Sequence, residues 1–102
     1  MLAIGCTSDA TREVVVYVAV DRGQAEPILE AYEKQSGVRV RAVYDAEAAK
    51  TTGLVTRLVA EASRPRCDVF WNNELVQTLH LAERGVIADY RPKAAEDIPA
   101  QF

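Results

Sequence analysis

Polar side chains follow each of three strand-like runs in this sequence, and their types suit the binding of a cation or a polar solute. Carboxylate oxygens bind hard cations, and amides hydrogen-bond to polar solutes. If the three runs are parallel strands of one sheet, their carboxyl ends meet at one edge, where ligands bind in open α/β sheets. We therefore predict that ligand-binding residues lie at these strand ends: Asp21, Asp45, Glu47, Asn72, Asn73 and Glu74.

Each of these residues also has a local structural explanation. Asp21 could simply start a helix, and Asn72 or Asn73 could be the N-cap that satisfies free N–H groups of the next helix. Glu74 could complement the dipole of that helix. For any single residue the local role is the simpler interpretation. The recurrence of oxygen-bearing side chains at all three strand ends favours a site.

Hydrophobic patterning predicts the elements that would position these residues. Strands are expected at 13–20, 38–44 and 68–71, and helices at 24–35, 51–62 and 74–84. The first strand is a continuous apolar run, typical of a strand buried on both faces. The second alternates with Arg39 and Arg41, which places it near the sheet edge. The βαβαβα order predicts an α/β fold with a parallel sheet and right-handed connections.

The apolar spacing also predicts which helix faces turn inward. Glycines are expected to end the first and third helices, at Gly37 and Gly85. A short extended piece is expected at 86–87, and residues 91–102 are interpreted as an unfinished connection. The predicted inward faces are, in chain order, Ala25, Ile28, Leu29 and Tyr32; then Leu54, Val55, Leu58, Val59 and Ala62; then Leu75, Val76, Leu79 and Ala82.

Composition limits the class of protein. The chain has 102 residues, enough for one small domain, and its formal net charge of -3 argues against nucleic acid as a partner. The start, MLAIGC, resembles the tail of a bacterial lipoprotein signal, so residues 1–12 are interpreted as a signal remnant and linker. Cys6 would then carry the lipid and provide the only membrane attachment. Cys67 would have no disulfide partner and would pack beside a strand.

Motifs of catalysis are missing from the sequence. The segment after the first strand has one glycine, Gly23, and no phosphate-binding loop. No GxSxG elbow occurs, and His80 stands alone without metal-ligand spacing. The third strand ends in Trp71-Asn72, whereas a phosphoacceptor receiver domain would need an aspartate there. We therefore expect a binding protein and not an enzyme.

With the elements in place, the chain resembles the first part of bacterial extracellular solute-binding proteins of ABC importers, and among them the ferric-iron-binding type. The matching stretches are VVYVAVD with AEPILEAYEKQSGVRV, then AVYDAEAAKTTGLVTRLVAEASRP, DVFWNNE and LAERGVIADY. The resemblance implies a type II periplasmic-binding-protein-like fold with two lobes and a hinge. Residues 13–90 would be a partial first lobe, three layers deep, with sheet order 2-1-3.

The resemblance also implies a ligand and partners. Ferric-binding relatives place a histidine after the first strand, where this chain has Asp21, and a glutamate at a position that falls on Asn73, beside Glu74. Asp21 and Glu74 are thus the candidate ligands for Fe(III), the transported ion. The relatives' main ligands, a tyrosine pair from the other lobe, are absent from this chain. The protein would be periplasmic or otherwise extracytoplasmic and would deliver its solute to an inner-membrane permease.

Three alternatives remain open at this point. The two carboxylates would also suit a polyamine. Asn72 and Asn73 would suit an anion such as a phosphonate, or a sugar-like solute. The chain could also be a truncated, stand-alone α/β domain without transport function.

Overall fold

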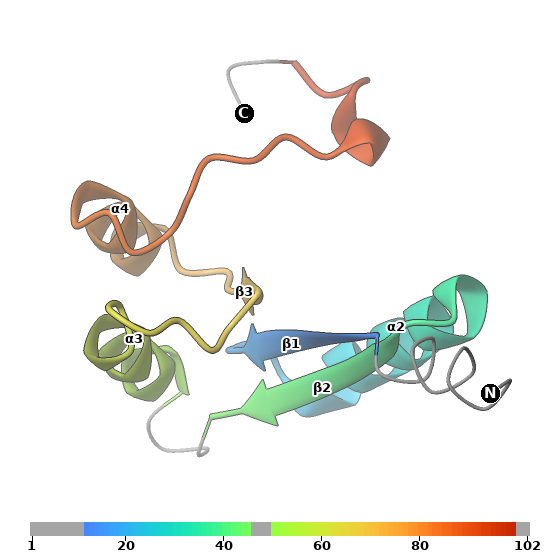
Figure 1. Ribbon diagram of the computed structural model, residues 1–102. Coiled ribbons are helices and arrows are strands. Elements are labelled where there is room, and N and C mark those ends of the chain that lie inside the picture. Colours follow the sequence, from blue (N-terminus) through green and yellow to red (C-terminus); the bar gives the residue numbers. More distant parts are fainter. Residues whose placement is uncertain (1–11, 46–49, 100–102) are drawn as a thin grey trace, which may run out of the picture.

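The computed structural model describes residues 12–45 and 50–99. Within them, strands and helices alternate along the chain (Figure 1), which confirms the predicted α/β order. The elements are β1 (Glu13–Val18), α2 (Arg22–Ser36), β2 (Arg39–Tyr44), α3 (Lys50–Ala60), β3 (Val69–Trp71), α4 (Leu75–Glu83) and a 3-10 turn, η1 (Lys93–Ala95).

The described strands form one parallel sheet in the order β2-β1-β3. In the sheet register, Val16 lies opposite Ala42 of β2 and Val69 of β3. The predicted order 2-1-3 is therefore confirmed, and so is the edge position of β2. The ends of β1 and β2 coincide, because Val18 pairs with Tyr44, so the segments that follow them start at the same level.

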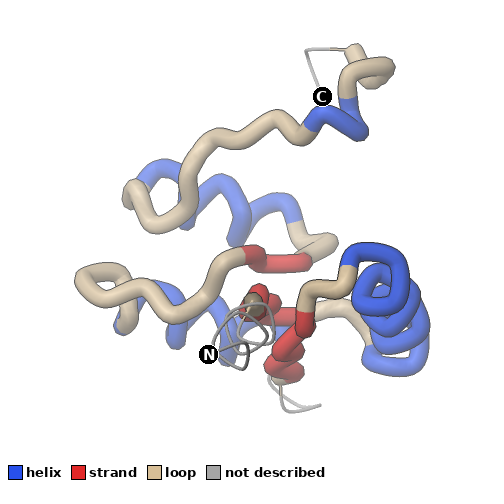
Figure 2. Tube along the Cα trace, turned by 45° about the vertical axis from the view of Figure 1, so that its right-hand side comes forward, coloured by secondary structure: helices blue, strands red, loops and turns tan. Residues whose placement is uncertain are grey.

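Helices cover both faces of the sheet, which gives the predicted three layers. Alternate residues of β1 point to opposite faces. Val16 and Val18 pack with Ala25 of α2, whereas Tyr17 packs on the other face. The apolar cluster around Tyr17 also contains Leu54 and Leu58 of α3 and Leu81 of α4. Figure 2 shows the strands between α2 on one side and α3 and α4 on the other.

Helix α2 begins two residues earlier than predicted. The carbonyl of Asp21 accepts the N–H groups of Gln24 and Ala25, each at 3.0 Å, so the helix starts directly after Asp21. Pro27 consequently lies inside the helix and not in its first turn. At the other end, Gly37 takes a φ of 76°, a left-handed conformation that glycine adopts without steric cost, and ends the helix as predicted.

The predicted inward face of α4 is wrong. Leu75, Val76 and Leu79 are 69%, 59% and 52% exposed, and Leu81 is the fully buried residue of the helix. Ala82 is also exposed. Helix α4 has apolar residues on two sides, so periodicity cannot tell which side meets the sheet. The packing of α4 beside α3 decides it.

The face predictions for the other helices are confirmed in part. On α3, Leu54 and Leu58 are buried, and Val55 and Val59 pack against the same cluster. Ala62 lies beyond the helix and is exposed. On α2, Ala25 is buried and Leu29 packs beside it, but Ile28 and Tyr32 are exposed.

The short extended piece expected at 86–87 does not form a strand, whereas Cys67 lies where it is expected. Val86 and Ile87 form no strand but pack against the cluster that contains Tyr17. Cys67 is half-buried beside β3, where its Sγ donates to the Val69 carbonyl at 3.0 Å. No helix among the described residues is long and apolar enough to cross a membrane.

Candidate functional site

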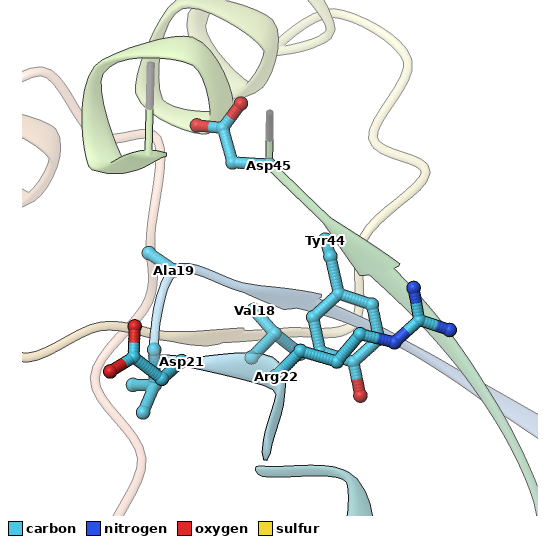
Figure 3. Close-up of a pocket in the computed structure, with 7 residues that line it drawn as sticks. Val18, Ala19, Asp21, Arg22, Tyr44 and Asp45 are labelled. Carbon is cyan, nitrogen blue, oxygen red and sulfur yellow. The ribbon is translucent and has the colours of Figure 1, made fainter. Parts of the chain in front are cut away.

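A pocket of about 230 Å³ lies at the carboxyl ends of β1 and β2 (Figure 3). Its polar lining comes from Asp21, Arg22, Tyr44 and Asp45, and its floor from residues 18–20. The pocket exists because the two strands end level with each other and the chain then turns in two directions, into α2 and toward α3. This is the position at which open parallel sheets bind ligands.

Arg22 is the cationic side chain of this pocket. Its guanidinium lies over the ring of Tyr44, 4.6 Å from the ring centroid, as Figure 3 shows. Its Nε also contacts Glu26 Oε2 at 3.3 Å, one helical turn further along α2. Both charged side chains are largely exposed, so the ion pair adds little stability. Arg22 therefore contributes a positive charge to the lining of the pocket, on the side of the Tyr44 ring.

Tyr44 remains protonated at neutral pH. Burial raises the pKa of its hydroxyl, and the nearby carboxylate of Glu26 raises it further, against the opposing effect of Arg22. A neutral phenol can donate and accept hydrogen bonds, and its ring offers a surface for cations. One face of that ring is already taken by Arg22.

Asp45 is tied to the helix that follows it. Its Oδ2 accepts the N–H of Leu54 at 2.9 Å, which joins the end of β2 to α3. The carboxylate also lies directly against Gly53, where a Cβ would come within 2.4 Å of Oδ1. Gly53 is therefore the residue type that lets Asp45 reach α3. The carboxylate lines the pocket and holds α3 at the same time.

The turn from β3 into α4 explains the pair of asparagines. The Asn72 amide donates to the Glu74 carbonyl and to Thr78 Oγ1, each at 2.8 Å. Its Oδ1 accepts the Glu74 N–H at 3.0 Å, so the side chain closes the turn from both ends. Asparagine favours such turns because its side chain mimics a backbone peptide.

Glu74 is the N-cap of α4. Its Oε1 accepts the N–H of Gln77 at 2.8 Å, and its backbone is extended at φ -109°. The N-cap is therefore Glu74 and neither of the two asparagines that were the local alternatives. The Asn72 side chain already makes its hydrogen bonds within the turn. The N-cap is two residues further along the chain. Asn73 is exposed.

The structure brings some of the predicted site residues together and separates others. Asp21 and Asp45 line the pocket after β1 and β2, whereas Asn72 lines a second pocket beside β3. Asn73 and Glu74 line neither of these two pockets. Glu47 and Cys6 lie outside the described residues. The five predicted positions that the structure describes thus do not share one pocket.

A metal ion would need ligands beyond those that the described residues provide. The described residues contain no group of three or more histidine, cysteine, aspartate or glutamate side chains that could hold a metal ion. Asp21 and Glu74 could therefore supply only part of a coordination sphere. Hard cations such as Ca²⁺ require six or more oxygen ligands, which two carboxylates cannot provide alone.

The prediction of site residues omitted Arg22. Its spacing of four from Glu26 indicates a helical ion pair, and this signal is visible in the sequence. Its stacking on Tyr44 is not visible there, because the two residues come from different elements that only the sheet brings together.

A separate polar cluster joins α3 to the central strand. The buried Tyr17 hydroxyl donates to Glu61 Oε1 at 2.7 Å, and Arg57 Nε contacts Glu61 Oε2 at 3.0 Å. The Arg57 guanidinium also lies 5.0 Å from the centroid of the Tyr17 ring. The hydrogen bond from Tyr17 lowers the pKa of Glu61, and the contact with Arg57 lowers it further. Burial raises the pKa of Tyr17, and so does its hydrogen bond to the Glu61 carboxylate. At neutral pH Glu61 is therefore ionised and Tyr17 is neutral, and the cluster has a structural role.

Comparison with solved structures places the chain beside two iron-binding proteins. Ferric iron-binding protein A from Mannheimia haemolytica, in an open conformation, matches with a TM-score of 0.74 and 28% identity over 90% of this chain. Apo ferric ion-binding protein A from Pasteurella haemolytica matches with a TM-score of 0.74 and 27% identity, also over 90% of this chain. No protein-family profile matches the chain, and no curated protein matches it significantly.

The matched region is a minor part of each of those proteins. This chain covers 28% of the first and 27% of the second. Both matched proteins are named for the binding of ferric iron. The chain therefore has an α/β fold that matches part of a periplasmic binding protein fold.

Proposed function

We propose that this chain is the first part of an extracytoplasmic solute-binding protein and that its solute is ferric iron. The observation that carries the proposal is the similarity to two ferric-binding proteins, at 27–28% identity over 90% of the chain. The sequence resemblance to the ferric-binding type, carried by DVFWNNE and its neighbours, agrees with it. The chain has no catalytic role in this proposal.

The solute would be held at the carboxyl ends of the strands. Asp21 is exposed beside the pocket, and Glu74 lies at the end of the β3–α4 turn. Both are hard oxygen donors, which suit Fe(III). Asn73 is the exposed amide next to Glu74 in the chain. A second lobe, absent from this chain, would add the remaining ligands, including tyrosines. Closure about a hinge would then enclose the ion for delivery to an ABC permease.

The next part of the gene gives the first test. We expect the reading frame to continue beyond the codon for Phe102 into a second α/β lobe that carries adjacent tyrosines. Sequencing of the encoding DNA checks this. A stop codon directly after Phe102 would contradict the proposal, because one partial lobe cannot close around an ion, and it would favour a stand-alone domain.

Ferric titration of the two-lobe protein tests the named ligands. We expect Asp21→Asn combined with Glu74→Gln to weaken Fe(III) affinity at least tenfold, because two hard anionic donors are lost. Glutamine keeps an oxygen for capping α4, so the fold should survive. Glu30→Gln, an exposed acid on α2, is the matched control. Unchanged affinity in the double variant would remove both residues from the site.

A small organic cation is the second candidate solute. Asp21, Asp45 and the Tyr44 ring line one pocket, and carboxylates with an aromatic ring suit an ammonium group. Competition between spermidine and Fe(III) in the same titration separates the two candidates. Displacement of spermidine by Fe(III) supports iron, and tight spermidine binding that Fe(III) does not affect supports the polyamine.

The lipid anchor is a further prediction about the same protein. Cys6 lies outside the described residues, so its lipidation rests on MLAIGC alone. We expect Cys6→Ser to move the protein from the membrane fraction of a bacterial host to the soluble periplasmic fraction. An unchanged distribution would show that Cys6 carries no anchor.

A further inference from the structure

The aromatic ring in the pocket at the ends of β1 and β2 is covered by a cation of the protein itself. Tyr44 is the aromatic residue of the pocket lining, and the Arg22 guanidinium lies 4.6 Å from the centroid of its ring. An organic ammonium ion binds an aromatic ring in the same way, with its charge above the ring and within about 6 Å of the centroid. Arg22 and such a solute would therefore compete for one place.

The fold holds Arg22 at this place through two elements. Arg22 is the first residue of α2 and Tyr44 is the last residue of β2. Because Val18 pairs with Tyr44, β1 and β2 end level with each other, and α2 starts close to the end of β2. One turn further along α2, Glu26 Oε2 contacts Arg22 Nε at 3.3 Å. The guanidinium is thus held between the ring and a carboxylate.

The remaining surroundings of Tyr44 do not favour a cationic solute. Tyr44 packs against the buried apolar cluster of Val16, Val18 and Ala25, which takes up part of its surface. Burial raises the pKa of its hydroxyl, so the phenol is neutral at neutral pH and adds no negative charge to the pocket. The recognition of an ammonium group by this residue would depend on the ring face, where Arg22 lies.

One of the two carboxylates of the pocket lining is directed toward α3. Asp45 Oδ2 accepts the N–H of Leu54 at 2.9 Å, and the carboxylate lies against Gly53. Figure 3 shows this side chain pointing away from Tyr44 and Arg22. A cationic solute that reaches the Tyr44 ring would therefore meet the positive charge of Arg22 there, without the Asp45 carboxylate beside it.

We propose that Arg22 determines the specificity of this pocket by covering the Tyr44 ring against organic ammonium solutes. Fe(III) is bound by hard oxygen donors and gains nothing from a ring face. A covered ring thus excludes one class of cation and leaves in place the oxygen donors that iron needs. The inference rests on the proposed function in that it concerns the same solute site, and it decides against a polyamine as the solute.

Titration of the full-length protein with tetramethylammonium chloride tests this role of Arg22. The backbone amide NMR signals of residues 18–22 report binding. Arg22→Ala should bind the probe about fivefold more tightly than the original protein, because the ring face opens and a like charge is removed. Adding Tyr44→Leu to Arg22→Ala should abolish this gain. Arg39→Ala is the matched control, since it removes an exposed arginine at the other end of β2, and it should leave the affinity unchanged.

Circular dichroism checks that the variants keep the fold. The Arg22 and Glu26 side chains are 66% and 47% exposed, so loss of their ion pair should cost little stability. If Arg22→Ala nevertheless loses helical signal, Arg22→Gln takes its place in the titration.

Three results would overturn the proposal. The first is an Arg22 variant that binds tetramethylammonium no more tightly than the original protein, including the case in which neither binds it. The second is an equal gain in Arg39→Ala, and the third is a gain that survives Tyr44→Leu, because net charge and not the ring would then set the affinity. The titration contains no iron, so a failure to bind Fe(III) would contradict the proposed function and leave this result unaffected.

Discussion

At the scale of single residues, one buried hydroxyl connects the sheet to α3. Tyr17 is 1% exposed, and its hydroxyl donates to the Glu61 carboxylate, which Arg57 also contacts. A buried hydroxyl needs such a partner, because leaving it unpaired costs free energy. Two predictions follow from this contact.

Replacement of the tyrosine should destabilise the chain by a moderate amount. We expect Tyr17→Phe to lower the free energy of unfolding by about 1–2 kcal/mol, because a hydrogen bond to a charged acceptor is lost while the ring stays in place. Urea denaturation measures this. Tyr32→Phe, at an exposed position on α2, should change it by less than about 0.5 kcal/mol. Equal effects of the two variants would show that the Tyr17 hydroxyl contributes nothing.

The same contact predicts a dependence on pH. The pKa of Glu61 is lower in the folded chain than in the unfolded chain, chiefly through the hydrogen bond from Tyr17. Its contribution to stability is therefore complete above the unfolded pKa and is lost as the pH falls through the folded pKa. Between about pH 6 and pH 3, the melting temperature of the original chain should fall further than that of Glu61→Gln. Parallel pH profiles would contradict this assignment.

At the scale of elements, two connections hold helices to strand ends, and each uses a predicted site residue. Asn72 closes the β3–α4 turn, and Asp45 joins β2 to α3. These side chains therefore have structural roles whatever the solute. Substitution of the adjacent Asn73 provides a control for Asn72, and substitution of Gly53 tests the role of Asp45.

The two asparagines should behave differently. We expect Asn72→Ala to lower the free energy of unfolding by about 1–2 kcal/mol, because the turn loses its side-chain hydrogen bonds to Glu74 and Thr78. Asn73→Ala is the matched control, since Asn73 is exposed, and it should leave stability unchanged. Thermal unfolding of both variants checks this. A larger loss at Asn73 would reverse the assignment of the two roles.

Gly53 should be sensitive to a single methyl group, and only when Asp45 is present. In the original chain, Gly53→Ala would bring the Cβ against the Asp45 carboxylate and break its bond to Leu54. We expect a net destabilisation of about 1 kcal/mol. In an Asp45→Ala background the same change should stabilise by up to about 1 kcal/mol, because alanine is the better helix former.

A double-mutant cycle at Gly53 and Asp45 measures this coupling. Gly23→Ala is the control, since a Cβ there meets nothing within 4 Å. If Gly53→Ala has the same effect with and without Asp45, the two residues are not coupled.

At the scale of the whole molecule, stability should depend on protein concentration. The outer face of α4 leaves Leu75, Val76 and Leu79 exposed in the single chain. Contacts between copies that bury these side chains would stabilise the folded state by mass action. We expect the melting temperature to rise with concentration. A sharp transition at a temperature that does not change with concentration would contradict this prediction.

The elements of the fold could be predicted from the sequence because their signals are local. The apolar run of β1, the spacing of Leu54 and Leu58, and Gly37 at the end of α2 each report on a few neighbouring residues. The sheet order 2-1-3 came from the resemblance to solute-binding proteins, and the structure confirms it. The positions of polar residues after the strands were also visible in the sequence.

The tertiary structure alone decided which partner each of these residues meets. Helix α4 buries Leu81 and not its predicted face, because apolar side chains lie on two sides of it and only its packing beside α3 selects one. Asn72 and Asp45 are held by backbone groups that the turns bring close, and Arg22 stacks on a ring from another element. Contacts of this kind depend on distances between elements, which the local periodicity of a sequence does not encode.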